Sequence, residues 1–357
     1  MKKLPVLSAL LVTGVAVAAI AQNAIPAMIV TNAKKDAGLN TIALPEDWAN
    51  YGEIMSTFQK KYGLKITNAS PQASSAEELQ AVKSLKGQKR GPDVLDVGPS
   101  FAIQGVQEKL LMAYKPSTWA SIPDSAKDKD GNWMGNYFGV ISFGVNTDVV
   151  KNVPKSFADL LKPEYKGMVA LNGNPTTAAA AFSGVWAAAL ANGGSLDNIQ
   201  PGVDFFAKLK AAGNFTPVAA SPATVQSGQT PIVIDWDYLN LAQTKAMAGK
   251  INYKTVVPTD GVYGSHYATA ISAYAPNPNA AKLWMEFIAS DEGQMLFLKG
   301  YAHPIRFNDM VKRGVIPQAM LSELPDAAVY NKVKFATPTQ TTKAKETLSA
   351  SWPKQMQ

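Results

Sequence analysis

The chain has 357 residues, of which 46% are hydrophobic and 17% are charged. This length exceeds what one compact core usually serves, which predicts two domains, and the composition excludes a largely disordered chain. The formal net charge is +7, but the basic residues are scattered, which argues against a nucleic-acid-binding surface. The chain has no cysteine, so no disulfide framework holds the fold.

The N-terminus has the three-part pattern of a secretory signal peptide. Two lysines precede an apolar run from Leu4 to Ile20, and small residues stand at Ala19 and Ala21. We expect cleavage after Ala21, so that residues 1–21 are a signal peptide. Without a cysteine for lipid attachment, the mature chain is expected to be free in a periplasm. An uncleaved membrane anchor is the alternative, although the apolar run is short for a membrane span.

A strand-then-helix rhythm follows the signal. The pattern predicts a strand over 40–44, a helix over 54–63, a strand over 64–70 and a helix over 74–87. A capping signature, Ser74 or Ser75 before Glu77 and Glu78, marks the start of the second helix. A third strand is predicted from residue 92, and Gly98 and Pro99 end it.

The middle of the chain continues the rhythm. Residues 137–150 alternate as a strand does, and residues 167–193 predict a strand, a turn and an alanine-rich helix. The remaining predicted elements are a helix over 202–213, a strand over 230–238, a strand pair over 253–275 and a mostly helical C-terminal third from Asn279.

Strands that alternate with helices predict an α/β fold with largely parallel sheets. No flexible linker separates the two domains, so we expect strands near residues 137–146 and 256–273 to join them and to act as a hinge. The chain then divides into a first lobe of residues 38–140 plus 270–357 and a second lobe of residues 141–269.

Four loops should meet at one place in such a fold. Ligands of open α/β sheets bind beyond the carboxyl ends of the strands. The loops predicted to gather there are Pro45–Tyr51, Gly98–Phe101, Asn172–Thr177 and Asp235–Asn240. We therefore expect them to line a ligand cleft between the two lobes.

Few catalytic designs fit this composition. The chain has two histidines, His266 and His303, and it lacks the metalloprotease, nucleophile-elbow, P-loop and dinucleotide-binding motifs. Asp235 and Asp237 lie two residues apart at a strand end and could serve as a carboxylate pair in a secreted hydrolase. We expect no catalysis, no cofactor and no bound metal, and the hydrolase stays the distant alternative.

Three segments carry a resemblance to a known family. They are Asn146–Gly167, which reads NTDVVKNVPKSFADLLKPEYKG, Ala280–Gln294, which reads AAKLWMEFIASDEGQ, and Lys299–Arg306, which reads KGYAHPIR. Together with the signal and the two lobes, they resemble the extracellular solute-binding proteins of ABC importers. The similarity is to the type 2 cluster, which includes polyamine-, ferric-ion- and phosphonate-binding receptors.

The resemblance implies a type 2 periplasmic binding fold and a receptor that closes on a small solute by a hinge motion. Its partners would be a membrane permease and a cytoplasmic ATPase, and most such receptors are monomers. A sensory receptor for chemotaxis would have the same features.

Acidic and aromatic residues favour a cationic amine as the ligand. Polyamine-binding members hold amines with carboxylates and aromatic faces. The corresponding candidates here are Asp235 and Asp237 as acids and Trp48, Trp236 and Tyr238 as aromatics. The alternative is that these residues form an ordinary strand end, in which the tryptophan packs in the core and the acids are solvated. Glu46 and Asp47 add charge nearby, although Asp47 can also cap the next helix.

Other residues favour an anion such as a phosphonate, a sugar phosphate or an organic acid. Thr176 and Thr177, with Asn174, precede the alanine-rich helix, and Arg306 could form a bidentate clamp. Ser100, after the third strand, could serve an anion in the same way, and Phe101 and His303 are further candidate ligand-binding residues. The alternatives are that Thr176 only caps a helix, that Arg306 forms a structural ion pair and that His303 packs in a turn.

Both sets could serve one zwitterion, such as an aminophosphonate. Ferric-binding members use an adjacent tyrosine pair, which this chain lacks, although Tyr263 and Tyr267 flank His266. We expect an amine-bearing solute, with a polyamine first and an aminophosphonate, another anion or a ferric complex as the alternatives.

Overall fold

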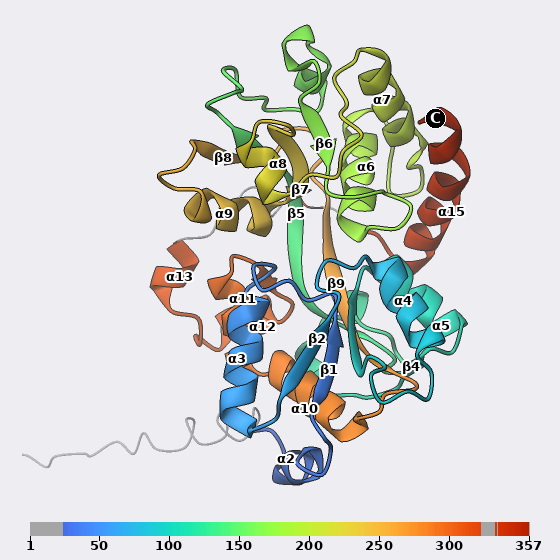
Figure 1. The fold of residues 1–357 in the computed structure, drawn as a ribbon, viewed down its shortest axis with the longest axis vertical. Coiled ribbons are helices and arrows are strands. Elements are labelled where there is room, and N and C mark those ends of the chain that lie inside the picture. Colours follow the sequence, from blue (N-terminus) through green and yellow to red (C-terminus); the bar gives the residue numbers. More distant parts are fainter. Residues whose placement is uncertain (1–23, 323–332, 334, 357) are drawn as a thin grey trace, which may run out of the picture.

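The computed structural model describes residues 24–322, 333 and 335–356. The expected signal peptide, residues 1–21, lies outside them. The molecule is elongated, and two strands run along its middle from a lower half to an upper half (Figure 1). Within the described residues, no helix combines the length and the apolar character needed to cross a membrane.

The lower half contains the N-terminal elements and a later group of helices. These are α2 (Ala27–Ala33), β1 (Leu39–Ile42), α3 (Tyr51–Tyr62), β2 (Ile66–Ala69), α4 (Ser75–Ser84), β3 (Val94–Val97), α5 (Pro99–Gln107), β4 (Leu111–Met112), α10 (Pro278–Ala289), α11 (Asp291–Lys299), β10 (His303–Pro304), α12 (Phe307–Lys312) and α13 (Gln318–Ser322).

The upper half contains the middle of the chain and the last helix. Its elements are β6 (Val169–Leu171), α6 (Ala179–Ala191), α7 (Gln200–Ala211), α8 (Pro222–Gln226), β7 (Ile232–Trp236), α9 (Asp237–Ala246), β8 (Tyr253–Val256) and α15 (Pro338–Gln355). Short 3-10 helices occur at Trp119–Ser121, Asp124–Ala126, Ala158–Leu161 and Pro163–Tyr165.

Two long strands connect the halves. They are β5 (Met134–Asn146) and β9 (Gly264–Ser272), close to the predicted crossings. The first part of β5 pairs with β9, and from Ile141 onward it pairs with β7. The strand order in the main sheet is β3-β9-β5-β7-β6, with β4 on β9 and β8 and β10 on β5.

The prediction of largely parallel sheets is wrong. Among the described strands, only the pairs β1–β2 and β6–β7 are parallel. The reason is that β5 carries the chain into the upper half and β9 brings it back, so the two strands run in opposite directions. Their other neighbours pair with them antiparallel as well.

Local signals place several helices as expected. The carboxylate of Glu77 accepts a hydrogen bond from the backbone N–H of Ser74 at 2.7 Å, which is the predicted capping box of α4. The alanine-rich segment forms α6, whose residues are buried up to Ala189. The expected loop at Asp235–Asn240 is absent, because β7 continues directly into α9.

The last helix touches both halves. α15 packs against α7 in the upper half and against α5 in the lower half (Figure 1). The ring centroids of Trp352 and Phe206 lie 5.5 Å apart, and Lys345 Nζ donates to Gln104 Oε1 at 2.7 Å. The lobe boundaries at 140/141 and 269/270 stay a prediction.

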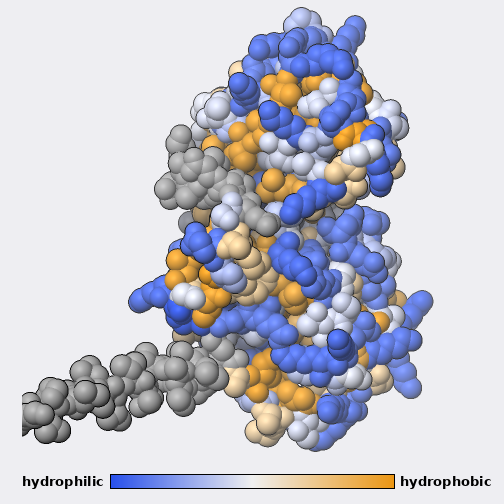
Figure 2. Space-filling view, turned by 90° about the vertical axis from the view of Figure 1, so that its left-hand side faces the viewer, coloured by the Kyte–Doolittle hydropathy of each residue, from blue (hydrophilic) through white to orange (hydrophobic). Residues whose placement is uncertain are grey.

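The surface is mixed. Figure 2 shows one face on which hydrophilic residues are spread among smaller apolar patches. Apolar atoms make up much of the surface of any folded protein, so scattered apolar patches need no special explanation.

Candidate functional site

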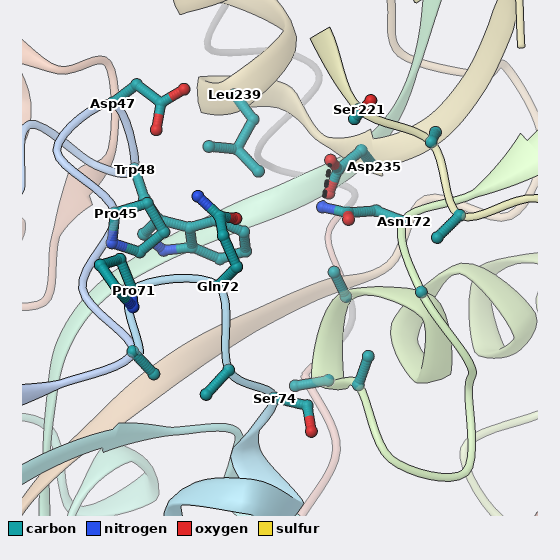
Figure 3. A pocket seen from close by; sticks show the side chains of 18 of the residues that line it. Pro45, Asp47, Trp48, Pro71, Gln72, Ser74, Asn172, Ser221, Asp235 and Leu239 are labelled. Carbon is teal, nitrogen blue, oxygen red and sulfur yellow. Dashed lines mark hydrogen bonds between the residues drawn. The ribbon is translucent and has the colours of Figure 1, made fainter. Parts of the chain in front are cut away.

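A cleft of about 920 Å³ lies between the two halves. The lower half contributes the loop after β1 and the start of α4, and the upper half contributes the loop after β6, the start of α6, α8 and α9. Figure 3 shows Trp48 and Gln72 on one wall and Asn172 and Asp235 on the other. The volume is in the range of pockets that enclose small molecules.

Asp235 lies on the upper wall, near the end of β7. Its side chain is oriented by Asn172, whose Nδ2 donates to Asp235 Oδ2 at 2.8 Å, and by the backbone N–H of Trp236, which donates to Oδ1 at 2.8 Å (Figure 3). Asp235 is 4% exposed. Burial raises the pKa of this carboxyl to about 7, although both hydrogen bonds lower it.

A buried polar network holds the strand behind Asp235. Ser142 Oγ donates to the Asp235 carbonyl at 3.1 Å, Asn240 Nδ2 donates to Ser142 Oγ at 2.8 Å, and the Tyr253 hydroxyl donates to Asn240 Oδ1 at 2.6 Å. Gly144 leaves room for this network, since a Cβ there would lie 1.8 Å from the Tyr253 hydroxyl. The cleft end of β7 is therefore fixed from behind.

Two further buried carboxylates line the lower wall. Asp96, on β3, accepts from Asn136 Nδ2 at 2.9 Å and from the Tyr137 hydroxyl at 2.8 Å. Glu78, on α4, accepts from the backbone N–H of Asp96 at 2.9 Å. Burial raises the pKa of Asp96 to about 6 and that of Glu78 well above its usual range. Acids thus face the cleft from both halves.

Aromatic rings form part of the lower wall. Trp48 and Tyr267 line the cleft, with ring centroids 5.4 Å apart in a T-shaped arrangement. Trp48 Nε1 donates to the Tyr137 hydroxyl at 2.6 Å, and that hydroxyl donates to Asp96. The indole is therefore held in one orientation by a chain of hydrogen bonds that ends at a cleft carboxylate.

The ionisable side chains that line the cleft are mostly acids. The acids are Asp47, Glu77, Glu78, Asp96 and Asp235, and the cation is Lys250. Among the described residues, His, Asp and Glu form no group of three that could hold a metal ion. Electrostatically, this lining favours a cationic group over an anionic one.

The start of α6 places backbone N–H groups at the cleft. Thr177, Ala178, Ala179 and Ala180 line the cleft, and no side chain caps the helix at Ala178. The first backbone N–H groups of a helix have no partner within the helix and can attract an anion. Thr176 does not line the cleft, because its hydroxyl and its N–H both bind Asn174 Oδ1 in the preceding turn.

The structure brings only some of the predicted residues to the cleft. Trp48, Thr177 and Asp235 line it. Trp236, Asp237 and Tyr238 instead point into the interior, where each is at most 1% exposed. Asp237 Oδ1 accepts from the backbone N–H of Val140 at 3.0 Å and from that of Tyr238 at 2.9 Å, so its carboxylate binds neighbouring backbone.

The residues predicted for an anion are also mostly elsewhere. Arg306 is 2% exposed and forms ion pairs with Asp291 and Asp309 at 3.1 and 3.0 Å. His303 stacks on Phe138, and burial lowers the pKa of its imidazole to about 4. Neither Arg306 nor His303 lines the cleft.

Ser100 and Phe101 are likewise turned away from it. Both belong to α5 and are buried, with Ser100 beside a separate small cavity of about 10 Å³. Lys345 Nζ lies over the Phe101 ring, 3.6 Å from its centroid.

Sequence reasoning missed several residues of the cleft. The sequence places Asn172 in a predicted cleft loop but gives no reason to single it out, and it suggests Tyr267 only as an iron ligand. Asp96 had a usable signal, because an acid inside the apolar strand β3 must have a partner or a function. Glu78 and Gln72 had no signal beyond their position near the start of α4.

A family model described as bacterial extracellular solute-binding protein matches residues 89–332, more than half of the chain. A putative 2-aminoethylphosphonate-binding periplasmic protein of Salmonella typhimurium is 28% identical over 223 residues. This match covers 60% of the present chain and 62% of the relative, which is less than two thirds of its length.

Solved structures share the fold. The periplasmic binding protein P5PA superposes with a TM-score of 0.73 at 18% identity, covering 90% of this chain and all of that one. AfuA from Actinobacillus pleuropneumoniae, with fructose-6-phosphate bound, gives a TM-score of 0.68 at 20% identity, covering 89% of this chain and 97% of its own. At these identities the similarity shows the fold alone.

Proposed function

The chain belongs to the bacterial extracellular solute-binding proteins, and from that premise we propose that it captures an amine-bearing solute in its cleft for an ABC importer. The observation that supports an amine as the ligand is Asp235, a buried carboxylate on the cleft wall whose protein partners are neutral. An ammonium group placed against it gains a charge-assisted hydrogen bond in a site shielded from water.

Aromatic faces support the same group of ligands. Trp48 and Tyr267 line the cleft near Asp96, and a cation over such a ring gains about 0.5–2 kcal/mol. We therefore propose that the amine of the solute is recognised by Trp48, Asp235 and Asn172.

Polyamines and aminophosphonates both carry the required amine. The five cleft acids against one lysine favour a polyamine, which has only positive groups. The uncapped start of α6 on the same cleft favours a zwitterion, whose phosphonate or carboxylate would lie against its N–H groups. The name of the Salmonella relative, with both an amine and a phosphonate, agrees with this second candidate.

We further propose that the receptor works in the periplasm and closes by a hinge in β5 and β9. The lobes would be residues 38–140 plus 270–357 and residues 141–269, so that α15 would belong to the first lobe while packing against α7 of the second. Closure around the solute would present the receptor to a membrane permease with its cytoplasmic ATPase, and binding energy would shift an open–closed equilibrium. A hydrolase is disfavoured, since the proposed pair of Asp235 and Asp237 does not meet in the cleft.

Calorimetry on the mature protein, refolded to remove carried-over solute, tests the ligand. Putrescine, spermidine and 2-aminoethylphosphonate are compared with ethylphosphonate, which lacks the amine, and with fructose-6-phosphate and ferric citrate. We expect binding only by the amines, and at least tenfold weaker binding to Asp235→Asn. Equal affinities for ethylphosphonate and 2-aminoethylphosphonate would show that the amine does not contribute to recognition.

Recovery of the ligand after incubation separates receptor from enzyme. A receptor returns the compound unaltered at the concentration added, whereas a hydrolase converts it. Mass spectrometry of the mixture after a day at 25 °C decides between the two.

A further inference from the structure

Three carboxylates of the cleft are buried without a positive partner. Asp235, Asp96 and Glu78 are 4%, 5% and 1% exposed. Their hydrogen bonds come from amide, hydroxyl and backbone N–H donors, and in the described part of the chain no lysine, arginine or histidine pairs with any of them. A buried charge with only neutral partners is costly, so such a group tends to hold a proton.

Hydrogen bonding leaves room for a ligand at Asp235. Each of its carboxylate oxygens accepts one bond from the protein, from Asn172 and from the Trp236 backbone, while an ionised carboxylate can accept about four. An ammonium group has three donors. The side chain faces the cleft (Figure 3), so it is the carboxylate best placed to exchange a proton for a bound cation.

The groups around Asp235 do not supply the missing positive charge. Tyr238 on α9, Tyr253 on β8 and Tyr267 on β9 interact with it electrostatically, and burial raises the pKa of all three well above the usual value. They therefore stay neutral near pH 7. Asp237, at the start of α9, is held by backbone N–H groups.

The remaining charged groups face it across the cleft or from the rim. On the lower half these are Asp96 and Glu78, with the exposed Asp47 and Glu77, and on the upper half the exposed Lys250. Neither histidine lines the cleft. The acids that line the cleft thus outnumber the single cation, and no positive charge of the described residues offsets the burial that favours the protonated form of Asp235 when no ligand is bound.

We propose that capture of a cationic amine in this cleft is coupled to release of a proton, chiefly from Asp235. This inference rests on the proposed function. In the unbound protein, part of the population carries the neutral acid. When the ammonium group binds, the acid's O–H bond breaks, its proton passes to solvent, and the carboxylate accepts hydrogen bonds from the ammonium group, so charge is balanced at each stage.

The coupling makes affinity depend on pH in one direction. Protons compete with the ligand for the carboxylate, so binding weakens as the pH falls. With a pKa of about 7 for Asp235, about half a proton is released at pH 7, and the dissociation constant is about 30-fold higher at pH 5.5 than at pH 8. Putrescine is the appropriate probe, because its amines stay charged over this range, whereas a phosphonate titrates within it.

Isothermal titration calorimetry in buffers of different ionisation enthalpy measures the proton count directly. The experiment uses the mature protein with putrescine at pH 7 in phosphate, imidazole and Tris, and the slope of the binding enthalpy against the buffer enthalpy gives the protons released. We expect about half a proton for the wild type and close to none for Asp235→Asn. Spermidine is the second probe if putrescine gives no heat. With 2-aminoethylphosphonate, the count for Asp235 is the difference between the wild type and Asp235→Asn, because the phosphonate titrates in both.

Asp47→Asn is the matched control. It removes an exposed carboxylate of the same cleft, so it can change the affinity while the proton count stays at about half. Binding of an amine with no proton release, or with the same release from Asp235→Asn, would overturn the inference and leave the receptor function intact. Failure of all three amines to bind would refute the proposed function and this inference together.

Discussion

The contact between Gly98 and Ala179 offers the sharpest test of lobe closure. Gly98 precedes α5 in the lower half and Ala179 begins α6 in the upper half. A Cβ on Gly98 would lie 2.4 Å from the Ala179 Cβ, whereas ordinary contacts are at 3.4–4 Å. The φ angle of Gly98 is −62°, so alanine fits the backbone itself, and the strain of Gly98→Ala falls on the contact between the halves.

The magnitude follows from that overlap. The two segments must separate by about 1 Å, from 2.4 Å to at least 3.4 Å, and overpacking of this kind costs about 1–3 kcal/mol. If only the closed arrangement bears the cost, the affinity for the solute falls about 5- to 150-fold. Calorimetry measures the affinity, and small-angle X-ray scattering with and without solute measures compaction.

Gly105→Ala, within α5, is the control. Its Cβ would lie 3.0 Å from the side chain of Leu111, within the lower half, so it can lower stability without separating the halves. The reasoning is refuted if Gly98→Ala binds and compacts as the wild type does, or if Gly105→Ala weakens binding equally.

Three further substitutions test single interactions. Tyr137→Phe removes the hydroxyl between Trp48 and Asp96 and should lower the unfolding free energy by about 1–3 kcal/mol in urea titrations; a loss below about 0.5 kcal/mol would contradict this. Because the folded-state pKa of Asp235 is raised to about 7, its charge destabilises the fold above pH 7 and this penalty fades toward pH 4. Asp235→Asn should therefore increase the unfolding free energy of the unligated protein at pH 8 by up to about 4 kcal/mol and raise its melting temperature. A lower melting temperature than that of the wild type would contradict this. Trp352→Ala should cost about 3–5 kcal/mol in urea titrations, and a cost under about 1 kcal/mol would show that α15 is loosely held.

Regular patterns made much of the fold predictable. The capping box at Ser74, the alanine-rich segment that became α6 and the crossing strands near β5 and β9 are all local signals in the sequence. The direction in which each strand pairs is not encoded by a local signal in the sequence. The antiparallel pairs arise because the chain crosses to the upper half and returns, and neither strand carries a mark of its direction.

The cleft was harder to predict because it depends on where one strand stops. The sequence after Ile234 suggested a loop that exposes two acids and two aromatics. In the structure, Asp235 ends on the cleft side of β7, Trp236 takes the opposite face, and α9 starts at once with Asp237. A single strand position therefore separates the cleft carboxylate from three buried neighbours, and periodicity alone does not fix that boundary.

Charge balance distinguishes Arg306, a structural ionisable group, from Asp235, the proposed ligand-binding one. Arg306 and Asp235 are similarly buried, but Arg306 has two carboxylates, Asp291 and Asp309, within ion-pair distance. Its charge is neutralised inside the protein, as a structural role requires. Asp235 has only neutral donors, and an asparagine could make comparable hydrogen bonds without the cost of a buried charge. A carboxylate at this position therefore lowers the stability of the unligated protein above pH 7, and under the proposed function the bound amine offsets that cost.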